Sequence, residues 1–202
     1  MLTVGITGGT GSGKTTILEL LKKEFLENDI GFISQDSYYN DNGKLSFDEK
    51  NKINFDHPDA IDFELIINHL NLLKNKKNIN QPIYSFIYHN RTEKTKLVKP
   101  KKIMIIEGIL ILNNIKLRDM IDYKVFVNAT ENLRFKRRLD RDINERGRIK
   151  EEVIELFNTR LNKMHKLYVE PMKEFCDIII DNNSKADLLE INPIIDVIKS
   201  HL

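Results

Sequence analysis

The chain has 202 residues, of which 41% are hydrophobic and 31% charged, and its formal net charge is +2. These values are typical of one globular domain, and they exclude a disordered or fibrous chain and give no reason to expect nucleic-acid binding. A single cysteine, Cys176, excludes an internal disulfide and a cysteine-rich zinc site, and we predict a core thiol. No apolar run approaches the roughly 20 residues that cross a bilayer and no signal peptide is evident, so neither a membrane nor secretion is expected and the cytoplasm is the expected compartment.

Short apolar segments alternate with helical patterns along the chain. Strands are predicted at residues 3–7, 31–35, 102–107, 123–128 and 177–181, and helices at residues 15–27, 60–74, 131–144, 150–168 and 187–200. This alternation predicts an α/β fold, a three-layer sandwich in which helices cover both faces of a mostly parallel sheet. The sequence shows no domain boundary, so we expect a single domain over residues 1–202.

Two segments depart from this alternation. Residues 37–59 are polar and rich in turn-forming residues, and they predict a flexible excursion. Residues 82–98 predict two strands, at 82–88 and 95–98, which are joined by a polar turn at 90–93. We therefore expect a β-hairpin inserted into the parallel α/β arrangement.

The most specific local pattern lies between the first strand and the first helix. Residues 8–15 fit the phosphate-loop pattern G-x-x-x-x-G-K-[ST], in which glycines let backbone N–H groups surround an anion at a helix N-terminus. A chance glycine-rich turn is the alternative, but the strand and the helix both fall where the pattern requires them. The residues predicted to bind the phosphates of ATP are Gly8, Gly9, Thr10, Gly11, Ser12, Gly13, Lys14, Thr15 and Thr16.

Within this loop, Lys14 is expected to reach the β- and γ-phosphates, and the Thr15 hydroxyl is expected to hold Mg²⁺. The pattern alone leaves open whether the nucleotide is ATP or GTP and what accepts the phosphoryl group. GTPases read guanine through an Asn-Lys-x-Asp segment, whereas residues 51–54 and 75–78 begin with Asn-Lys and lack the aspartate. GTP hydrolysis is therefore disfavoured.

Two acids follow predicted strands and are expected at the edge of the sheet where ligands bind. Asp36 follows residues 31–35, and Glu107 ends the strand at 102–107. Transfer of a phosphoryl group to an alcohol needs a carboxylate that accepts the hydroxyl proton, and we assign this role to Asp36. Glu107 is the candidate acid on the magnesium side, so the predicted metal site is Thr15, Glu107 and Asp36. The alternative is that each carboxylate only caps a turn.

A basic helix face follows the fourth predicted strand. Its arginines recur at spacings of three and four, and two more flank the glycine after the helix; they are Arg134, Arg137, Arg138, Arg141, Arg146 and Arg148. Guanidinium groups suit phosphate geometry, so residues 137–150 predict a lid over the transferring phosphates, with Arg141 as a catalytic group. A solvated face paired with Asp140, Asp142 and Glu145 stays the alternative, and these acids argue against a nucleic-acid surface.

Taken together, these stretches resemble the uridine–cytidine kinases, a P-loop kinase family related to phosphoribulokinase and pantothenate kinase. The matching stretches, in the order of the family, are GGTGSGKTT at 8–16, QDSYY at 35–39, NFDHPDAID at 54–62, PIYSFIYH at 82–89, IEGILI at 106–111 and RRLDRDINERGR at 137–148. The resemblance implies transfer of the ATP γ-phosphoryl group to the 5′-hydroxyl of uridine or cytidine, with Mg²⁺, in pyrimidine salvage. The rivals are a P-loop kinase for another small acceptor and a non-enzymatic nucleotide-binding switch.

The resemblance also implies roles for individual residues. Asp36 matches the base for the 5′-hydroxyl, and Asp59 with Arg138 matches the pair that holds the ribose hydroxyls. The residues that match those contacting the pyrimidine are Tyr84, Phe86 and His89, and those matching the triphosphate lid are Arg141, Arg146 and Arg148. The family further implies a homo-oligomer, a tetramer.

The hairpin poses a geometric problem for this assignment. Phe86 offers a flat face to a base, and Tyr84 and His89 can bond its polar edge. His89, however, is an odd number of positions from the other two, so a regular strand would turn it to the opposite face. If all three contact one base, the chain must leave strand geometry near Tyr88; if not, the aromatics only alternate as in any half-buried strand.

The chain departs from the family pattern at two places. Leu156 stands where a glutamine is expected, and Asn162-Lys163 replaces Arg-Pro. These changes bear on secondary contacts with substrate or triphosphate. The sequence leaves the preference between uridine and cytidine, the use of GTP as donor and feedback by CTP or UTP undetermined.

Overall fold

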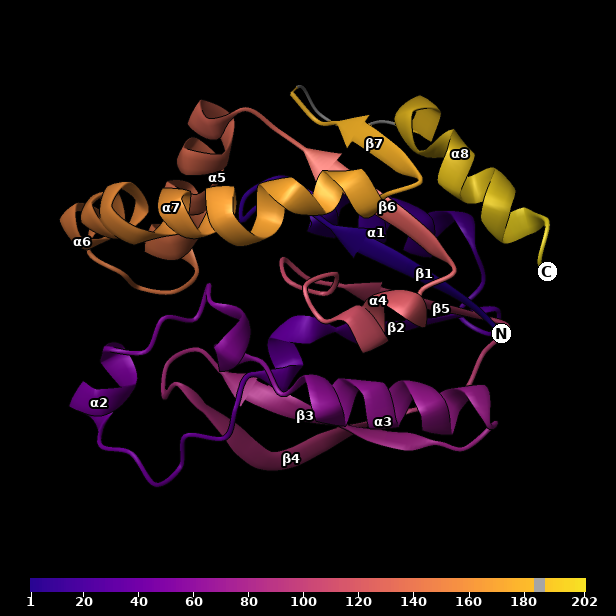
Figure 1. The fold of residues 1–202 in the computed structure, drawn as a ribbon, viewed down its shortest axis with the longest axis horizontal. Coiled ribbons are helices and arrows are strands. Elements are labelled where there is room, and N and C mark those ends of the chain that lie inside the picture. Colours follow the sequence, from indigo (N-terminus) through magenta and orange to yellow (C-terminus); the bar gives the residue numbers. More distant parts are fainter. Residues whose placement is uncertain (184–187) are drawn as a thin grey trace.

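The computed structural model describes residues 1–183 and 188–202, and its centre is a five-stranded sheet in the order β2-β5-β1-β6-β7 (Figure 1). Every neighbouring pair is parallel, so the carboxyl ends of all five strands lie at one edge. The strands are β1 (Leu2–Thr7), β2 (Ile30–Ser34), β5 (Ile103–Glu107), β6 (Tyr123–Asn128) and β7 (Ile178–Asp181). The predicted parallel sheet is confirmed, with boundaries shifted by one residue at most.

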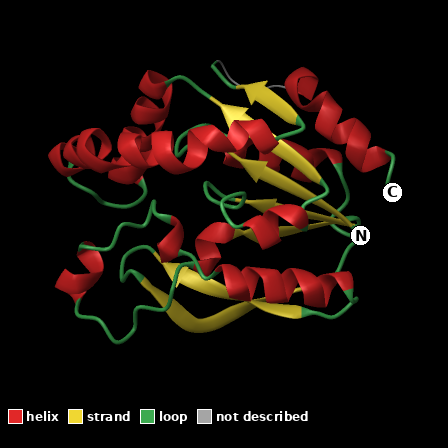
Figure 2. Cartoon of the chain, viewed as in Figure 1, coloured by secondary structure: helices red, strands yellow, loops and turns green. Residues whose placement is uncertain are grey.

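Helices cover both faces of the sheet (Figure 2). Successive strand residues face opposite sides, so Ile103 and Ile105 pack with α1 (Lys14–Glu24) and α8 (Leu188–Lys199) in one apolar cluster. Met104 and Ile106 belong to a second cluster, which includes α3 (Phe63–Lys74) and α4 (Ile115–Asp119). Burial on both faces explains the unbroken apolar run of β5, and the predicted three-layer α/β sandwich is confirmed.

The hairpin forms a separate antiparallel sheet next to α3, made of β3 (Ile79–Ser85) and β4 (Asn90–Val98) (Figure 1). Ser85 pairs with Asn90, so the turn occupies residues 86–89 rather than the predicted 90–93. Residues 90–93 read as a turn because they are polar, yet an exposed strand needs no apolar side chains on its outer face. The hairpin was predicted correctly, but the position of its turn was wrong.

The remaining differences lie outside the sheet. The excursion at 37–59 contains α2 (Phe47–Asn51), whose N-terminus is fixed by a reciprocal capping box between Ser46 and Glu49. Helix α3 begins at Phe63 rather than residue 60, because the Asp62 carboxylate caps the N–H of Leu65 at 3.0 Å. The start predicted for the last helix, Asp187, lies outside the described residues. Cys176 is half-buried at the margin of a core cluster rather than inside it.

A long helical path follows α5 (Glu131–Asn144); it begins at the same end of the molecule as α2 and runs back toward β7 (Figure 1). It runs through α6 (Lys150–Leu156), a π-helical turn (Phe157–Leu161), α7 (Asn162–Met164), a second π-helical turn (His165–Val169) and a 3₁₀ segment (Glu170–Phe175). π-Helical turns are frequent near functional sites, and both lie here in a segment predicted as one regular helix. In the described part of the chain no helix is long and apolar enough to cross a bilayer.

Candidate active site

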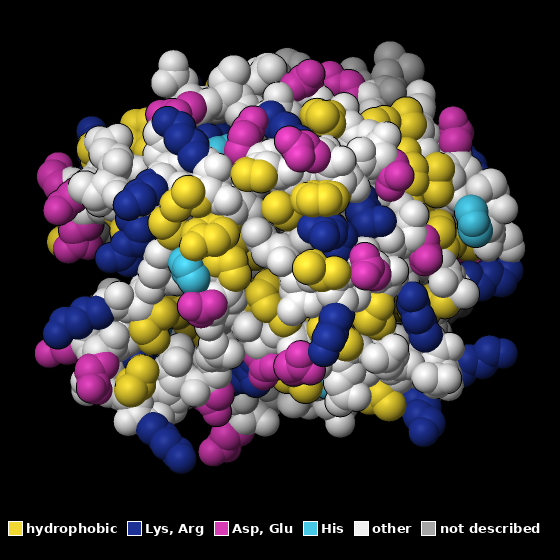
Figure 3. Space-filling view, viewed as in Figure 1, with side chains coloured by type: hydrophobic (Ala, Val, Ile, Leu, Met, Phe, Trp, Pro, Cys, Tyr) yellow, Lys and Arg dark blue, Asp and Glu magenta, His cyan; other side chains and the backbone are white. Residues whose placement is uncertain are grey.

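A cavity of about 1060 Å³ opens between the carboxyl edge of the sheet, the hairpin and the arginine-rich end of α5. In the space-filling view, the margin of the molecule is indented between α6 and α2, and Lys or Arg side chains lie beside the indentation (Figure 3). Twelve of the predicted site residues line the cavity: Thr10, Lys14, Thr15, Asp36, Tyr84, Phe86, His89, Glu107, Arg138, Arg141, Arg146 and Arg148. Segments far apart in the sequence thus meet at one place.

The phosphate loop joins β1 to α1 at the base of this cavity. Gly11 and Gly13 have φ angles of +73° and +99°, in the left-handed region that favours glycine. A Cβ on either residue would also collide, with the carbonyl oxygen of Arg134 at Gly11 and with the Asn182 amide at Gly13. The loop therefore needs its glycines both for backbone conformation and for close packing against α5 and the end of β7.

Lys14 is the first residue of α1, and its side chain folds back over the loop. Its ammonium donates hydrogen bonds to the carbonyl oxygens of Gly8 at 2.9 Å and Gly9 at 3.1 Å. Burial lowers the pKa of Lys14 to about 8, and the carboxylates of Glu107 and Asp36 oppose this shift. The group therefore stays mostly charged at neutral pH and lies where it can meet a bound phosphate.

Asp36 and Glu107 are neighbours because β2 and β5 pair with Ser34 opposite Glu107. The Ser34 hydroxyl donates a 2.5 Å hydrogen bond to Glu107. Burial raises the pKa of Glu107, and Asp36 adds to the shift while Lys14 opposes it. Two carboxylates that repel each other in a buried site are a suitable environment for a divalent cation.

The donor set fits magnesium. Mg²⁺ in phosphoryl-transfer sites takes one or two protein oxygen ligands and completes its shell with phosphates and water, and Thr15, Asp36 and Glu107 all line this cavity. The described residues contain no cluster of three or more His, Cys, Asp or Glu side chains that could hold a metal. A magnesium site made of two carboxylates and a hydroxyl does not require such a cluster.

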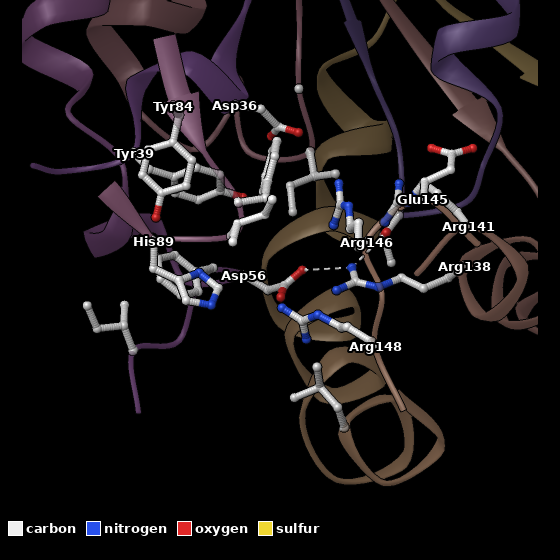
Figure 4. A pocket seen from close by; sticks show the side chains of 18 of the residues that line it. Asp36, Tyr39, Asp56, Tyr84, His89, Arg138, Arg141, Glu145, Arg146 and Arg148 are labelled. Carbon is white, nitrogen blue, oxygen red and sulfur yellow. Dashed lines mark hydrogen bonds and ion pairs between the residues drawn. The ribbon is translucent and has the colours of Figure 1, made fainter. Parts of the chain in front are cut away.

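Asp56 and Arg138 meet at one wall of the cavity (Figure 4). Their side chains are 3.8 Å apart and only 15% and 9% exposed. Burial raises the pKa of Asp56, and the guanidinium of Arg138 opposes that shift. Arg138 also donates a 2.8 Å hydrogen bond to the Thr10 hydroxyl, so one side chain connects the phosphate loop with the segment that carries Asp56.

Aromatic side chains form the other side of the cavity, where Tyr39 and Tyr84 lie near His89 (Figure 4). Tyr39 and Tyr84 have ring centroids 5.0 Å apart, and His89 stacks on Phe55 at 5.0 Å and 18°. Phe86 packs on both tyrosines at 5.5–6.5 Å. A flat ligand would find both ring faces and ring edges here.

His89 solves the geometric problem that the sequence posed. Strand β3 ends at Ser85, and His89 has a φ of +50°, which only a few per cent of non-glycine residues adopt. The chain thus leaves strand geometry before Tyr88 and returns the imidazole to the cavity. Burial, aided by Arg148 and Lys50, lowers the pKa of His89, so the ring is neutral near pH 7 and can both donate and accept.

Four arginines from α5 and the following turn face the aromatic wall (Figure 4). They are Arg138, Arg141, Arg146 and Arg148, and they surround Asp142, which is fully buried. The guanidinium of Arg146 also lies 4.4 Å from the centre of the Phe86 ring. The predicted cluster is therefore a wall of the cavity rather than a solvated helix face.

The family described as Phosphoribulokinase / Uridine kinase family matches residues 3–189. This chain belongs to that family. A uridine kinase of Clostridium botulinum (strain Okra / Type B1) is 49% identical over 193 residues, which cover 94% of each chain. A uridine kinase of Listeria monocytogenes serotype 4a (strain HCC23) is 41% identical, over 93% of this chain and 92% of the relative.

Solved structures show the same fold at lower identity. Phosphoribulokinase from Rhodobacter spheroides superposes with a TM-score of 0.67 at 16% identity, covering 92% of this chain and 71% of that one. D-glycerate 3-kinase from Cryptococcus neoformans var. grubii gives a TM-score of 0.62 at 16% identity, covering 89% and 86%. At this identity the likeness concerns the fold alone.

One predicted contact of this kinase is wrong. Asp59 was expected beside Arg138, but its side chain is 92% exposed, lies 3.3 Å from His57 and does not line the cavity. Asp56, three residues earlier, is the buried partner of Arg138. Pro58 opens a 3₁₀ turn that directs Asp59 away, and the useful signal was the position of Asp56 directly after the apolar Phe55.

Other predicted residues support the cavity without lining it. Thr16 is exposed and does not line the cavity, and neither do five residues that form the loop itself: Gly8, Gly9, Gly11, Ser12 and Gly13. On α5, Arg134 is buried against the loop at Gly9, and Arg137 donates a 3.1 Å hydrogen bond to the Asn182 carbonyl. Asn182 in turn donates a 2.9 Å hydrogen bond to the Ser12 carbonyl, so Arg134 supports the kinase's phosphate loop directly and Arg137 supports it through Asn182.

Some cavity residues were not predicted. Tyr39 is buried in the aromatic wall, and Arg160 lines the cavity from the first π-helical turn. Leu156, noted as a departure from the family pattern, also lines it, whereas Asn162 and Lys163 do not. The cavity therefore has an apolar side chain at residue 156, where the family pattern led us to expect a hydrogen-bonding glutamine.

Proposed function

We propose that this chain transfers the γ-phosphoryl group of ATP to the 5′-hydroxyl of uridine or cytidine, with Mg²⁺ as cofactor. The observation that carries the proposal is the meeting, in one cavity, of a phosphate loop, a candidate base and an aromatic hairpin beside the Asp56–Arg138 pair. Relatives named uridine kinase, similar over nearly the full chain, support the same reaction. We also propose, from the resemblance to the uridine–cytidine kinases, that the protein acts in pyrimidine salvage in the cytoplasm and forms a homotetramer.

Donor and acceptor sites follow from the two ends of the cavity. The loop N–H groups and Lys14 bind the triphosphate, and Arg141 from α5 and Arg146 from the turn after it approach it. The ribose lies against Asp56 and Arg138, whose acceptor oxygens and N–H donors suit vicinal hydroxyls. The base lies in the aromatic wall, where the buried hydroxyl of Tyr84 has no hydrogen-bond partner in the described part of the chain.

The reaction then needs one proton transfer and one displacement. Asp36 accepts the proton of the 5′-hydroxyl as its oxygen forms a bond to the γ-phosphorus, and the bond from that phosphorus to the β–γ bridging oxygen breaks. The products are the nucleoside 5′-monophosphate and ADP. Thr15, Asp36 and Glu107 would hold Mg²⁺, which supplies positive charge to the phosphate oxygens when it is bound.

A coupled assay of ADP release over a panel of acceptors tests the proposal. Uridine and cytidine should support turnover, and 5′-deoxyuridine, which lacks the accepting hydroxyl, should give only the background rate. ADP release that depends instead on a sugar phosphate or on pantothenate would identify a different kinase of this fold. ATP binding without acceptor-dependent ADP release would identify a nucleotide-binding switch.

A further inference from the structure

Asp142 is a buried acidic side chain behind the arginine wall. It lies in the last turn of α5 and its side chain is completely buried. One carboxylate oxygen accepts a 2.9 Å hydrogen bond from Nε of Arg138. The other accepts from Nε and a terminal nitrogen of Arg141 at 3.2 and 3.1 Å, and lies 3.5 Å from Arg146. Asp142 itself does not line the cavity.

The backbone of Asp142 also binds the fourth arginine, Arg148. Its carbonyl oxygen accepts a 3.0 Å hydrogen bond from the N–H of Arg148, which closes the turn after α5. Gly147 permits this turn with a φ of +64°. Every arginine that lines the cavity from the end of α5 and the turn that follows is thus anchored on one residue.

The charges explain why such an anchor is needed. Burial and the nearby Arg141 and Arg138 lower the pKa of Arg146, and Asp142 opposes the effect. Although burial alone favours a protonated carboxyl, the three guanidiniums hold the pKa of Asp142 below its usual range. The carboxylate is therefore ionised and offsets the mutual repulsion of three cations in a confined space.

We propose that Asp142 is a positioning residue for phosphoryl transfer: it aligns Arg138 toward the acceptor and Arg141 and Arg146 toward the triphosphate. This inference rests on the proposed function. Arg138 reaches both Thr10 of the phosphate loop and Asp56, so its orientation bears on donor and acceptor together. Asp142 fixes that orientation without touching either substrate, and it acts on the rate of transfer more than on nucleotide binding.

The test compares Asp142→Asn with Asp140→Asn. Asp140 lies two positions earlier on α5, is exposed, and accepts a hydrogen bond from Asn144 at 2.8 Å, so its replacement removes the same charge outside the cavity. Steady-state kcat and KM for uridine and ATP are measured with the ATP Kd and the binding stoichiometry from calorimetry. Each variant is assayed well below its own melting temperature.

We expect kcat to fall ~10²-fold in Asp142→Asn, the loss that a displacement of about 1 Å produces in a catalytic group. The ATP Kd should stay unchanged or become tighter at full stoichiometry, because the substitution makes the wall more positive. Asp140→Asn should match the wild type. Asp142→Glu, which restores the charge, should recover part of kcat.

Three results would overturn the inference. A kcat of Asp142→Asn within about twofold of the wild type would remove the positioning role. Loss of ATP binding or stoichiometry in parallel with kcat would mean that Asp142 only maintains the fold. Failure of the wild type itself to phosphorylate uridine would remove the proposed function and this inference with it, whereas the first two results leave the proposed function intact.

Discussion

Replacing Asp56 by asparagine tests the assignment of the acceptor site. The Asp56 side chain is 15% exposed and lies 3.8 Å from Arg138. Water therefore competes little with a ligand for hydrogen bonds to this carboxylate. A hydrogen bond to a charged group contributes about 1.5–3 kcal/mol, and tenfold corresponds to about 1.4 kcal/mol. We therefore expect Asp56→Asn to lower kcat/KM for uridine roughly 10- to 140-fold, with the KM for ATP unchanged.

The matched control is Asp59→Asn, three residues along the same segment. Its carboxylate is 92% exposed, and substitutions at such surface positions change free energies by about 0.5 kcal/mol or less, which is about twofold. Both variants are measured with uridine varied at saturating ATP and then with ATP varied at saturating uridine. A large loss in Asp59→Asn beside near wild-type kinetics in Asp56→Asn would refute the assignment.

Three further outcomes are expected. Asp36→Asn should abolish uridine-dependent ADP release while calorimetry shows ATP still binding; near wild-type turnover would remove Asp36 as the base. His89→Ala should raise the KM for uridine far more than that for ATP, and equal losses would mean that His89 only supports the hairpin. Burial and Arg134 lower the pKa of His165 to about 4, so the unfolded chain binds more protons between pH 4 and 6.5. The free energy of unfolding should therefore fall by up to about 3 kcal/mol as pH drops through that range, and a denaturation series in which His165→Gln shows the same fall would contradict this.

The features that the sequence predicted well are those determined locally. The phosphate loop depends on glycines within eight residues, and its strand and helix adjoin it. The buried run at residues 103–106 could only be a central strand, because both faces are covered. Asp36 and Glu107 were placed correctly since parallel strands end at the same edge of a sheet.

The features that the sequence predicted poorly depend on contacts between distant segments. Asp56 and Asp59 are equivalent carboxylates in a linear reading, and only the turn at Pro58 and the distant Arg138 separate their roles. The hairpin turn moved to residues 86–89 because strand pairing, rather than polarity, determines where a strand ends. Asp142 was named only in the alternative of a solvated helix face, whereas it is buried among the arginines it pairs with.

The most direct test of the account is the identity of the product. The chain is incubated with ATP, Mg²⁺ and uridine, and ³¹P NMR with authentic standards shows where the phosphoryl group goes. The account predicts uridine 5′-monophosphate and ADP in equal amounts, and no phosphorylated product from 5′-deoxyuridine. Phosphate found on the 2′- or 3′-oxygen, or only inorganic phosphate and ADP, would contradict it.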